Sequence, residues 1–185
     1  MTIIDFIQAN LNFQINHHED LPFSVTEKIF LEGSIITEYN KVENYIYFLK
    51  KGIVQISVSY NDDERIFDFI EAGNFLGSYS SLLTQLPSDV KLTALTNIEV
   101  EVIERKALFD AYKHSLLANQ LGRLATERVY VSNTKREKDF LTKTAEQRYQ
   151  DLLQNRPNLI AILPVYKIAK YLAIQPESLS RIRKR

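Results

Sequence analysis

The 185-residue sequence predicts an α+β fold: an N-terminal double-stranded β-helix (jelly-roll) barrel, a long dimerisation helix, and a small C-terminal helix-turn-helix domain with little or no wing. Three observations support this. Residues 23–104 hold short β-rich runs, residues 105–156 contain one glycine and no proline, and residues 165–185 fit a helix-turn-helix pattern. We therefore expect three parts, which are a barrel (1–106), a dimerisation helix with hinge (107–139) and a DNA-binding domain (140–185).

The barrel is predicted from many short strands. Residues 2–11 first indicate an amphipathic helix, because their apolar residues approximate a helical period. Runs rich in β-branched and aromatic residues then predict strands over 23–30, 44–50, 54–60, 65–70, 90–96 and 100–104. Turn signals with glycine, asparagine or aspartate separate several of these runs. Near-regular spacing of short strands is typical of a β-barrel or jelly roll.

The glycine-poor stretch predicts a long helix with an apolar stripe. The stripe repeats at spacings of four, three and seven, and consists of Leu117, Leu121, Leu124 and Val131. Such a stripe predicts a seam between two copies of the helix, as in a coiled coil, although Arg128 interrupts it. The alternative is that the stripe packs on the barrel of its own chain. A long helix has more than one face, so it can pack on its barrel and on a second helix at once.

A new helix is predicted to begin after this stretch. Thr144 and Gln147 have the Thr-x-x-Gln spacing of a capping box. The helix should end before Pro157, because the residue before a proline avoids the helical conformation. This start site places a hinge at residues 140–143.

Residues 165–185 predict two short crossed helices. Apolar residues stand where such helices touch, at Ile168, Leu172, Ile174, Leu179 and Ile182, and Ala169 is small at the closest approach. Ala173 stands in the turn, where a positive φ favours glycine, at a cost of about 1 kcal/mol. Pro176 suits the first turn of the second helix. Side chains suited to base edges and phosphates are Tyr166, Lys167, Glu177, Ser178, Ser180, Arg181 and Lys184. The alternative is a helical hairpin with a charged tail.

The net charge of zero conceals an uneven distribution. Residues 135–185 hold 12 Lys+Arg and 5 Asp+Glu, a net of +7, and the remaining 11 Lys+Arg and 18 Asp+Glu give −7. A basic patch beside a base-reading helix supplies sequence-independent attraction to phosphate. The alternative, a chance clustering of solvated charges, stays open.

Composition excludes several classes of site. There are no cysteines, so disulfides, thiolate zinc sites and cysteine-bound iron–sulfur clusters are ruled out. The only histidines are His17, His18 and His114, and no bound metal or haem is expected from them. No nucleophile–base pattern or phosphate-binding glycine loop indicates an enzyme. Without a leader or an apolar run of spanning length, we expect a cytoplasmic protein with no membrane partner.

Four turn motifs in order, followed by the C-terminal pattern, carry a family resemblance. They are Glu32-Gly33-Ser34-Ile35, the run from Tyr47 to Gly52, the run from Glu71 to Phe75, and Leu76-Gly77. With them the chain resembles the Crp/Fnr superfamily of bacterial transcription regulators. The resemblance implies a homodimer on a near-palindromic DNA operator, with half-sites roughly 34 Å apart and RNA polymerase as a further partner. It also implies base contacts from Glu177 and Arg181. Pro176 occupies the position of a third family contact, for which Ser178 and Ser180 would compensate by contacting phosphate or base edges.

The same resemblance bears on cyclic nucleotides. Binders in the family follow the glycine of the Phe-Gly turn with Glu and place an Arg about ten residues on. Here Ser78 follows Gly77, and Ser88 and Asp89 follow Pro87. An aspartate would repel the cyclic phosphate. We therefore expect no dependence on cyclic AMP or cyclic GMP.

Another small effector could still occupy the barrel. Its site would be lined by Phe69, Phe75, Gly77, Ser78, Tyr79, Ser88, Arg123 and Thr126. The alternative is that the protein's own side chains fill this space, and the sequence favours neither.

The sequence thus predicts a dimeric, sequence-specific DNA-binding transcription regulator that does not depend on cyclic nucleotides. A second hypothesis is a small-ligand-binding or protein-interaction barrel whose helix-turn-helix no longer reads DNA. The missing wing and Pro176 keep this second hypothesis open, whereas the charge distribution argues against it.

Overall fold

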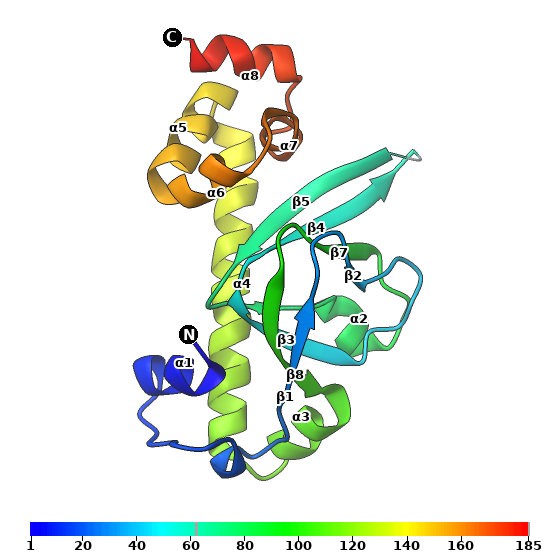
Figure 1. The fold of residues 1–185 in the computed structure, drawn as a ribbon, viewed down its shortest axis with the longest axis vertical. Helices are drawn as coiled ribbons and strands as arrows, with labels where there is room; N and C mark the ends of the chain where they lie inside the picture. Colours follow the sequence, from blue (N-terminus) through cyan, green and yellow to red (C-terminus); the bar gives the residue numbers. More distant parts are fainter. Residues whose placement is uncertain (62, 185) are drawn as a thin grey trace. The chain divides into compact units, whose positions relative to one another are not determined.

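The structure, a computed structural model, describes residues 1–61 and 63–184, so the last residue of the predicted DNA-binding domain lies outside it. The chain forms two compact units, one ending at Glu127 and one beginning at Arg128. Figure 1 labels the elements of both. The boundary falls inside the long helix α4 (Leu116–Thr142), which contributes turns to each unit.

Two four-stranded antiparallel sheets form the barrel. The first sheet has the order β1 (Thr26–Phe30), β8 (Ile98–Glu104), β3 (Tyr45–Lys51) and β6 (Phe75–Leu76). The second has the order β2 (Ile35–Thr37), β7 (Val90–Ala94), β4 (Ile53–Tyr60) and β5 (Asp63–Glu71). All six predicted strands exist. The sequence analysis omitted β2 and β6, which are three and two residues long and too short to show an alternating pattern.

The central strands of the first sheet, β3 and β8, are buried on both faces. On β3, Tyr47 and Leu49 point into the core between the two sheets, whereas Phe48 points outward into a second core. Val102 and Ile103 on β8 divide in the same way. Because successive strand residues face opposite sides, a second apolar layer must cover the outer face.

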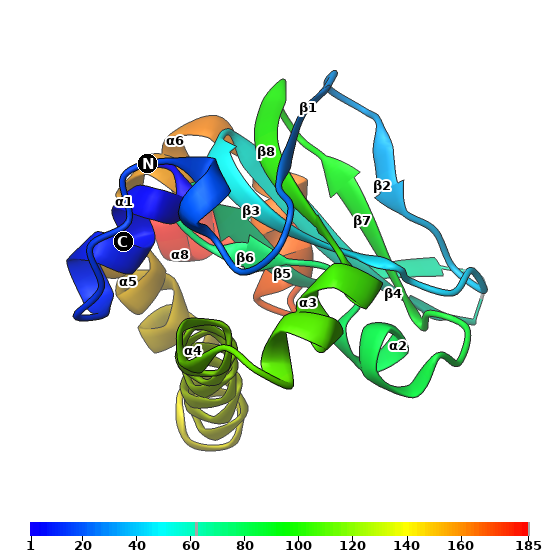
Figure 2. The ribbon, with the colours of Figure 1, turned by 90° about the horizontal axis from the view of Figure 1, so that it is seen from below.

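Helices supply that layer. The outer core joins α1 (Ile3–Asn10), α3 (Arg105–Tyr112) and the first turns of α4. Figure 2 looks along α4, with α3 beside its first turns. The predicted N-terminal helix is confirmed as α1. A short 3-10 helix, η1 (His18–Asp20), and helix α2 (Tyr79–Thr84) complete this unit.

The apolar stripe on α4 does not face a partner along its whole length. Leu117 and Leu121 are buried in the outer core of their own barrel, and Leu124 packs against the same core. The assignment of Leu117 and Leu121 to a dimer seam is therefore corrected. Leu124 is half-buried and Val131 is 65% exposed, so a dimer contact from these two residues stays a prediction. Periodicity identified a buried face but could not identify what buries it.

Four short helices form most of the second unit: α5 (Ala145–Asn155), α6 (Pro157–Ile162), α7 (Val165–Tyr171) and α8 (Pro176–Arg183). The predicted capping box is confirmed, since Thr144 Oγ1 accepts from the Gln147 N–H and the Gln147 side chain accepts from the Thr144 N–H. Residues 140–142, predicted as part of a hinge, instead continue α4. Within residues 1–61 and 63–184, no helix is long and apolar enough to cross a membrane.

Candidate nucleic-acid interface and barrel site

A small apolar core holds α7 against α8. Ile168, Ala169 and Leu172 from the first helix and its cap are at most 3% exposed, and Leu179 from the second is fully buried. These are residues that the sequence placed at the helix crossing. Ala169 is small enough to let the helices approach closely. The helix-turn-helix geometry is therefore confirmed.

The turn between the helices has left-handed backbone at one residue. Ala173 has φ +54°, which is the positive φ that the sequence predicted there. Its N–H donates to the Lys170 carbonyl at 3.1 Å, and the Ile174 N–H donates to the Ala169 carbonyl at 3.0 Å. This pair of bonds is a Schellman motif, which normally uses glycine at the left-handed position. The motif fixes the angle at which the chain leaves α7 for α8.

Arg148 of α5 joins the hinge to this turn. One guanidinium nitrogen donates to the Lys143 carbonyl at 2.7 Å, and the other terminal nitrogen donates to the Leu172 carbonyl at 3.0 Å. The guanidinium carbon also lies 4.6 Å from the centroid of the Phe140 ring. Burial lowers the pKa of Arg148. The sequence analysis missed this residue, because its partners are backbone carbonyls that leave no trace in the sequence.

Further contacts hold α4 to the short helices. The Arg136 guanidinium carbon lies 4.9 Å from the centroid of the Tyr171 ring, which links α4 to α7. Lys143 pairs with Asp139 at 2.8 Å and with Asp151 at 2.5 Å. Hydrogen bonds to these carboxylates raise the pKa of Lys143, so the lysine stays charged. The helix-turn-helix is thus held to the end of α4 by several independent contacts.

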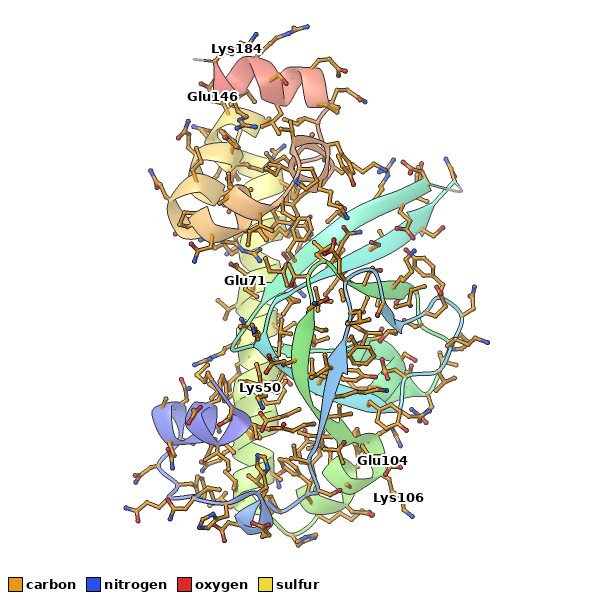
Figure 3. All side chains as sticks on the ribbon, in the orientation of Figure 1. Lys50, Glu71, Glu104, Lys106, Glu146 and Lys184 are labelled. Atoms are coloured by element: carbon orange, nitrogen blue, oxygen red, sulfur yellow. The ribbon has the colours of Figure 1, made fainter. Side chains whose placement is uncertain are left out.

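One face of α8 collects the predicted base-reading side chains. Exposed side chains at helical spacings of three and four form a single stripe of Glu177, Ser180, Arg181 and Lys184. Figure 3 labels Lys184 at the C-terminal end of α8. The Ser180 hydroxyl donates to the Pro176 carbonyl at 3.0 Å, which leaves its oxygen able to accept.

The remaining predicted DNA contacts lie on the flank of α8 and on α7. Ser178 is half-buried on the flank of α8. On α7, Tyr166 is 53% exposed and Lys167 is half-buried. The structure therefore brings four of the seven predicted residues onto one exposed helix face, with Ser178 on the flank of the same helix and Tyr166 and Lys167 on α7.

In the barrel, the two serines that replace the family's charged residues lie side by side. Ser78 and Ser88 are at most 2% exposed, and their Oγ atoms are 2.7 Å apart. Ser88 Oγ also lies 2.8 Å from the Val90 carbonyl oxygen and accepts from the Val90 N–H at 3.2 Å. The hydroxyl of Ser88 is therefore fully engaged by the protein itself.

Other predicted pocket residues divide into two groups. The Tyr79 hydroxyl lies 3.1 Å from Thr126 Oγ1 on α4, so these two residues do meet. Arg123 does not line an enclosed site, because its side chain is 73% exposed and its Nε lies 3.5 Å from Glu127. The prediction for Arg123 is corrected, since it stands on the outward side of its helix.

Phe75 is also corrected. Its ring packs at 5.0 Å from Phe48 and 5.5 Å from Phe6, between centroids, in the outer core beneath α1. Phe69 is 1% exposed on β5, opposite Gln55 of β4. Gly77 lies between β6 and α2, with φ +151°. The parity of the two-residue strand β6 could not be fixed from sequence, which explains the error for Phe75.

The comparisons with known proteins agree with this architecture. Residues 27–115 match the family model of the cyclic nucleotide-binding domain. No curated protein matches the sequence. Among solved structures, the chain is similar to FixK2 from Bradyrhizobium japonicum, with 21% identity and a TM-score of 0.68 over 86% of this chain and 83% of that one.

Two further solved structures share the arrangement. The c-di-GMP-responsive global regulator CLP of Xanthomonas campestris has 16% identity and a TM-score of 0.67 over 86% of this chain and 85% of that one. A protein from Eubacterium rectale described as a transcriptional regulator of the Crp/Fnr family has 13% identity and a TM-score of 0.70 over 97% and 80%. Residues 27–115 therefore resemble a cyclic nucleotide-binding domain, and the chain shares the fold of these solved regulators.

Proposed function

We propose that the protein is a homodimeric transcription regulator that binds a near-palindromic DNA operator through α8 and needs no cyclic nucleotide. The observation that carries this proposal is the exposed stripe on α8, where Glu177, Ser180, Arg181 and Lys184 stand above a closed helix-turn-helix core. A recognition helix requires this combination of a fixed support and a free polar face.

The chemistry of the stripe suits the major groove. The Glu177 carboxylate can accept from cytosine N4, and the Arg181 guanidinium can donate to guanine O6 and N7 together. Each well-made bidentate pair contributes about 1–3 kcal/mol of discrimination between bases. The excess of 12 Lys+Arg over 5 Asp+Glu in residues 135–185 supplies attraction to the phosphate backbone.

Dimerisation is proposed to use the part of α4 beyond the barrel core. Val129, Tyr130 and Val131 are 47%, 71% and 65% exposed, and Leu141 is 80% exposed. A second copy of α4 would cover such side chains, and a two-fold dimer would present two α8 helices to the two halves of a palindrome. Leu117 and Leu121, which are already covered, take no part.

Independence from cyclic nucleotides rests on the serine pair. Two neutral hydroxyls that bond to one another and to the Val90 backbone cannot neutralise a cyclic phosphate. Asp89, next to Ser88, would repel it. The barrel therefore serves as a scaffold or binds a ligand of other chemistry.

Selection from a randomised duplex library, at near-physiological salt and with sequencing of the retained DNA, tests the proposal. We expect a near-palindrome with half-sites about 34 Å apart. Arg181→Ala should abolish the motif, whereas Arg123→Ala, an exposed arginine on the barrel part of α4, should keep it. A folded dimer that recovers no motif would refute the proposal and favour a barrel protein that no longer reads DNA.

A further inference from the structure

Some helices of this chain start with a side-chain cap and others do not, since α2, α3, α6 and α7 also lack a side-chain cap hydrogen bond. Helices α1 and α5 begin with threonines, Thr2 and Thr144, whose side chains accept from a backbone N–H in full capping boxes. Helix α8 begins after Gln175, whose side chain makes no cap hydrogen bond. Serine, threonine, aspartate and asparagine cap well, and glutamine is not among these residues. Gln175 therefore forgoes stabilisation that a shorter side chain would provide.

The backbone of Gln175 nevertheless performs the capping role. Its carbonyl accepts from the Ser178 N–H at 3.0 Å and from the Leu179 N–H at 3.1 Å. Its φ of −75° and ψ of 148° are extended, as an N-cap requires. The side chain itself is exposed. The start of α8 is thus well formed by the backbone of Gln175. The exposed side-chain amide of Gln175 takes no part in forming it.

The next residue makes the amide more conspicuous. Pro176 occupies the first helical position, and it has neither an N–H nor a polar side chain. It cannot hydrogen-bond to a base edge as donor. In a helix-turn-helix, the N-terminal residues of the second helix are those that contact base edges. At this end of α8, the exposed polar side chains are Gln175 and Glu177, and Ser178 is half-buried.

We infer that Gln175 is a specificity-determining residue that reads an adenine in each half-site, beside the base pair contacted by Glu177. The inference rests on the proposed DNA-binding function. A carboxamide offers one acceptor and one donor in the same plane, which matches the N6 donor and N7 acceptor of adenine in the major groove. Guanine presents two acceptors there, so the amide oxygen would face guanine O6 without a hydrogen bond.

Selection from the same randomised library with Gln175→Ala measures the inference directly. We expect one adenine in each half-site to lose about 5- to 150-fold preference, while the bases read by Glu177 and Arg181 keep theirs. Gln175→Glu should move the preference at that base pair to cytosine, because a carboxylate accepts from cytosine N4. A uniform loss of affinity with an unchanged motif would show a phosphate contact and overturn the inference, and an unchanged affinity would overturn it as well.

A stability measurement separates base reading from damage to the fold. Gln175→Ser supplies a good cap, so it should raise the melting temperature by about 2–4 °C while it loses the adenine preference. A purely structural role for Gln175 would not give these opposite changes. Gln154→Ala, at an exposed glutamine on α5, is the matched control and should alter neither property. If the unaltered protein recovers no motif, the proposed function itself fails, which is a different result from a motif that ignores Gln175.

Discussion

The Nε2 atom of His18 lies 2.9 Å from Oε1 of Glu101, across 83 residues of sequence. The other carboxylate oxygen of Glu101 accepts from the Ile3 N–H at 2.6 Å. Glu101 is fully buried on the outer face of β8, whereas the His18 side chain is 38% exposed. The Glu101 carboxylate therefore links both α1 and η1 to the first sheet. Because α1 belongs to the outer core that also holds the first turns of α4, this link supports that core.

Glu101→Ala should lower the free energy of unfolding by about 3–5 kcal/mol, because it leaves a buried N–H and an imidazole without their acceptor. Urea denaturation measures this change. The control is Glu99→Ala on the same strand, where the exposed pair with Lys51 contributes at most about 1 kcal/mol. Equal effects of the two substitutions would show that Glu101 anchors nothing.

Ala173→Gly should stabilise the protein by about 1 kcal/mol, because glycine adopts the positive φ of the turn without steric cost. Thermal unfolding should show a higher melting temperature. Ala161→Gly in α6 is the counterpart, and it should destabilise by about the same amount, since it adds glycine to ordinary helix. A loss of stability at both sites would contradict the left-handed geometry at Ala173.

Arg148→Lys should cost about 1–3 kcal/mol, because a single ammonium cannot bond to the Lys143 and Leu172 carbonyls as a planar guanidinium does. The substitution should also make the turn at Ala173 and Ile174 open more often. Amide hydrogen exchange of Ala173 and Ile174 should become faster in the full chain. Arg183→Lys, on exposed α8, should leave both amides unchanged, and protection that survives Arg148→Lys would count against the bridge.

Asp5→Asn should reduce stability at neutral pH and not at low pH. The Thr2 backbone N–H and hydroxyl, which bond to the carboxylate, lower the pKa of Asp5 below its usual 3.8. A group whose pKa is lowered by folding stabilises the protein above that value and loses the effect as the pH falls through the folded pKa. Melting curves of both proteins should therefore converge as the pH drops below about 3.8. If the two proteins still differed in melting temperature at acid pH, the charge of the Asp5 carboxylate would not be the source of the stabilisation.

Cyclic AMP at 1 mM should leave the melting temperature unchanged, because the serine pair is bonded to itself and to Val90. A ligand bound with Kd about 1 µM would at this concentration add about 4 kcal/mol of stability. Thermal shift measurements detect changes in stability much smaller than about 4 kcal/mol. Cyclic GMP should behave in the same way, and a clear upward shift with either nucleotide would disprove the prediction.

The sequence predicted most of the architecture, because patterns that depend on local chemistry are visible in it. The capping box at Thr144, the strands and the helix crossing at Ala169 follow from propensity, periodicity and size. Each concerns residues that are near neighbours in the chain. The structure accordingly altered few of these assignments.

What the sequence could not predict depends on partners distant in the chain. The stripe through Leu117 and Leu121 looked like a dimer seam, because periodicity cannot tell the chain's own barrel from a second copy. Glu101 stands in an alternating run that suggests a solvent-facing carboxylate, yet α1 covers it. Arg148 bonds to backbone carbonyls, which every residue carries. These four residues determine how elements join, and only the fold identifies them.

Within the described part of the chain, the first sheet ends at β1 and β6 and the second ends at β2 and β5. An edge strand can pair with a strand of another chain, which is the usual start of fibrous aggregation. Strand β5 carries Glu64, Arg65, Asp68 and Glu71, and β1 carries Glu27 and Lys28 beside the exposed Ile29. Charges on both edges must lose water before a foreign strand can add. The charges on β1 and β5 therefore disfavour growth of the sheets of one barrel onto those of another.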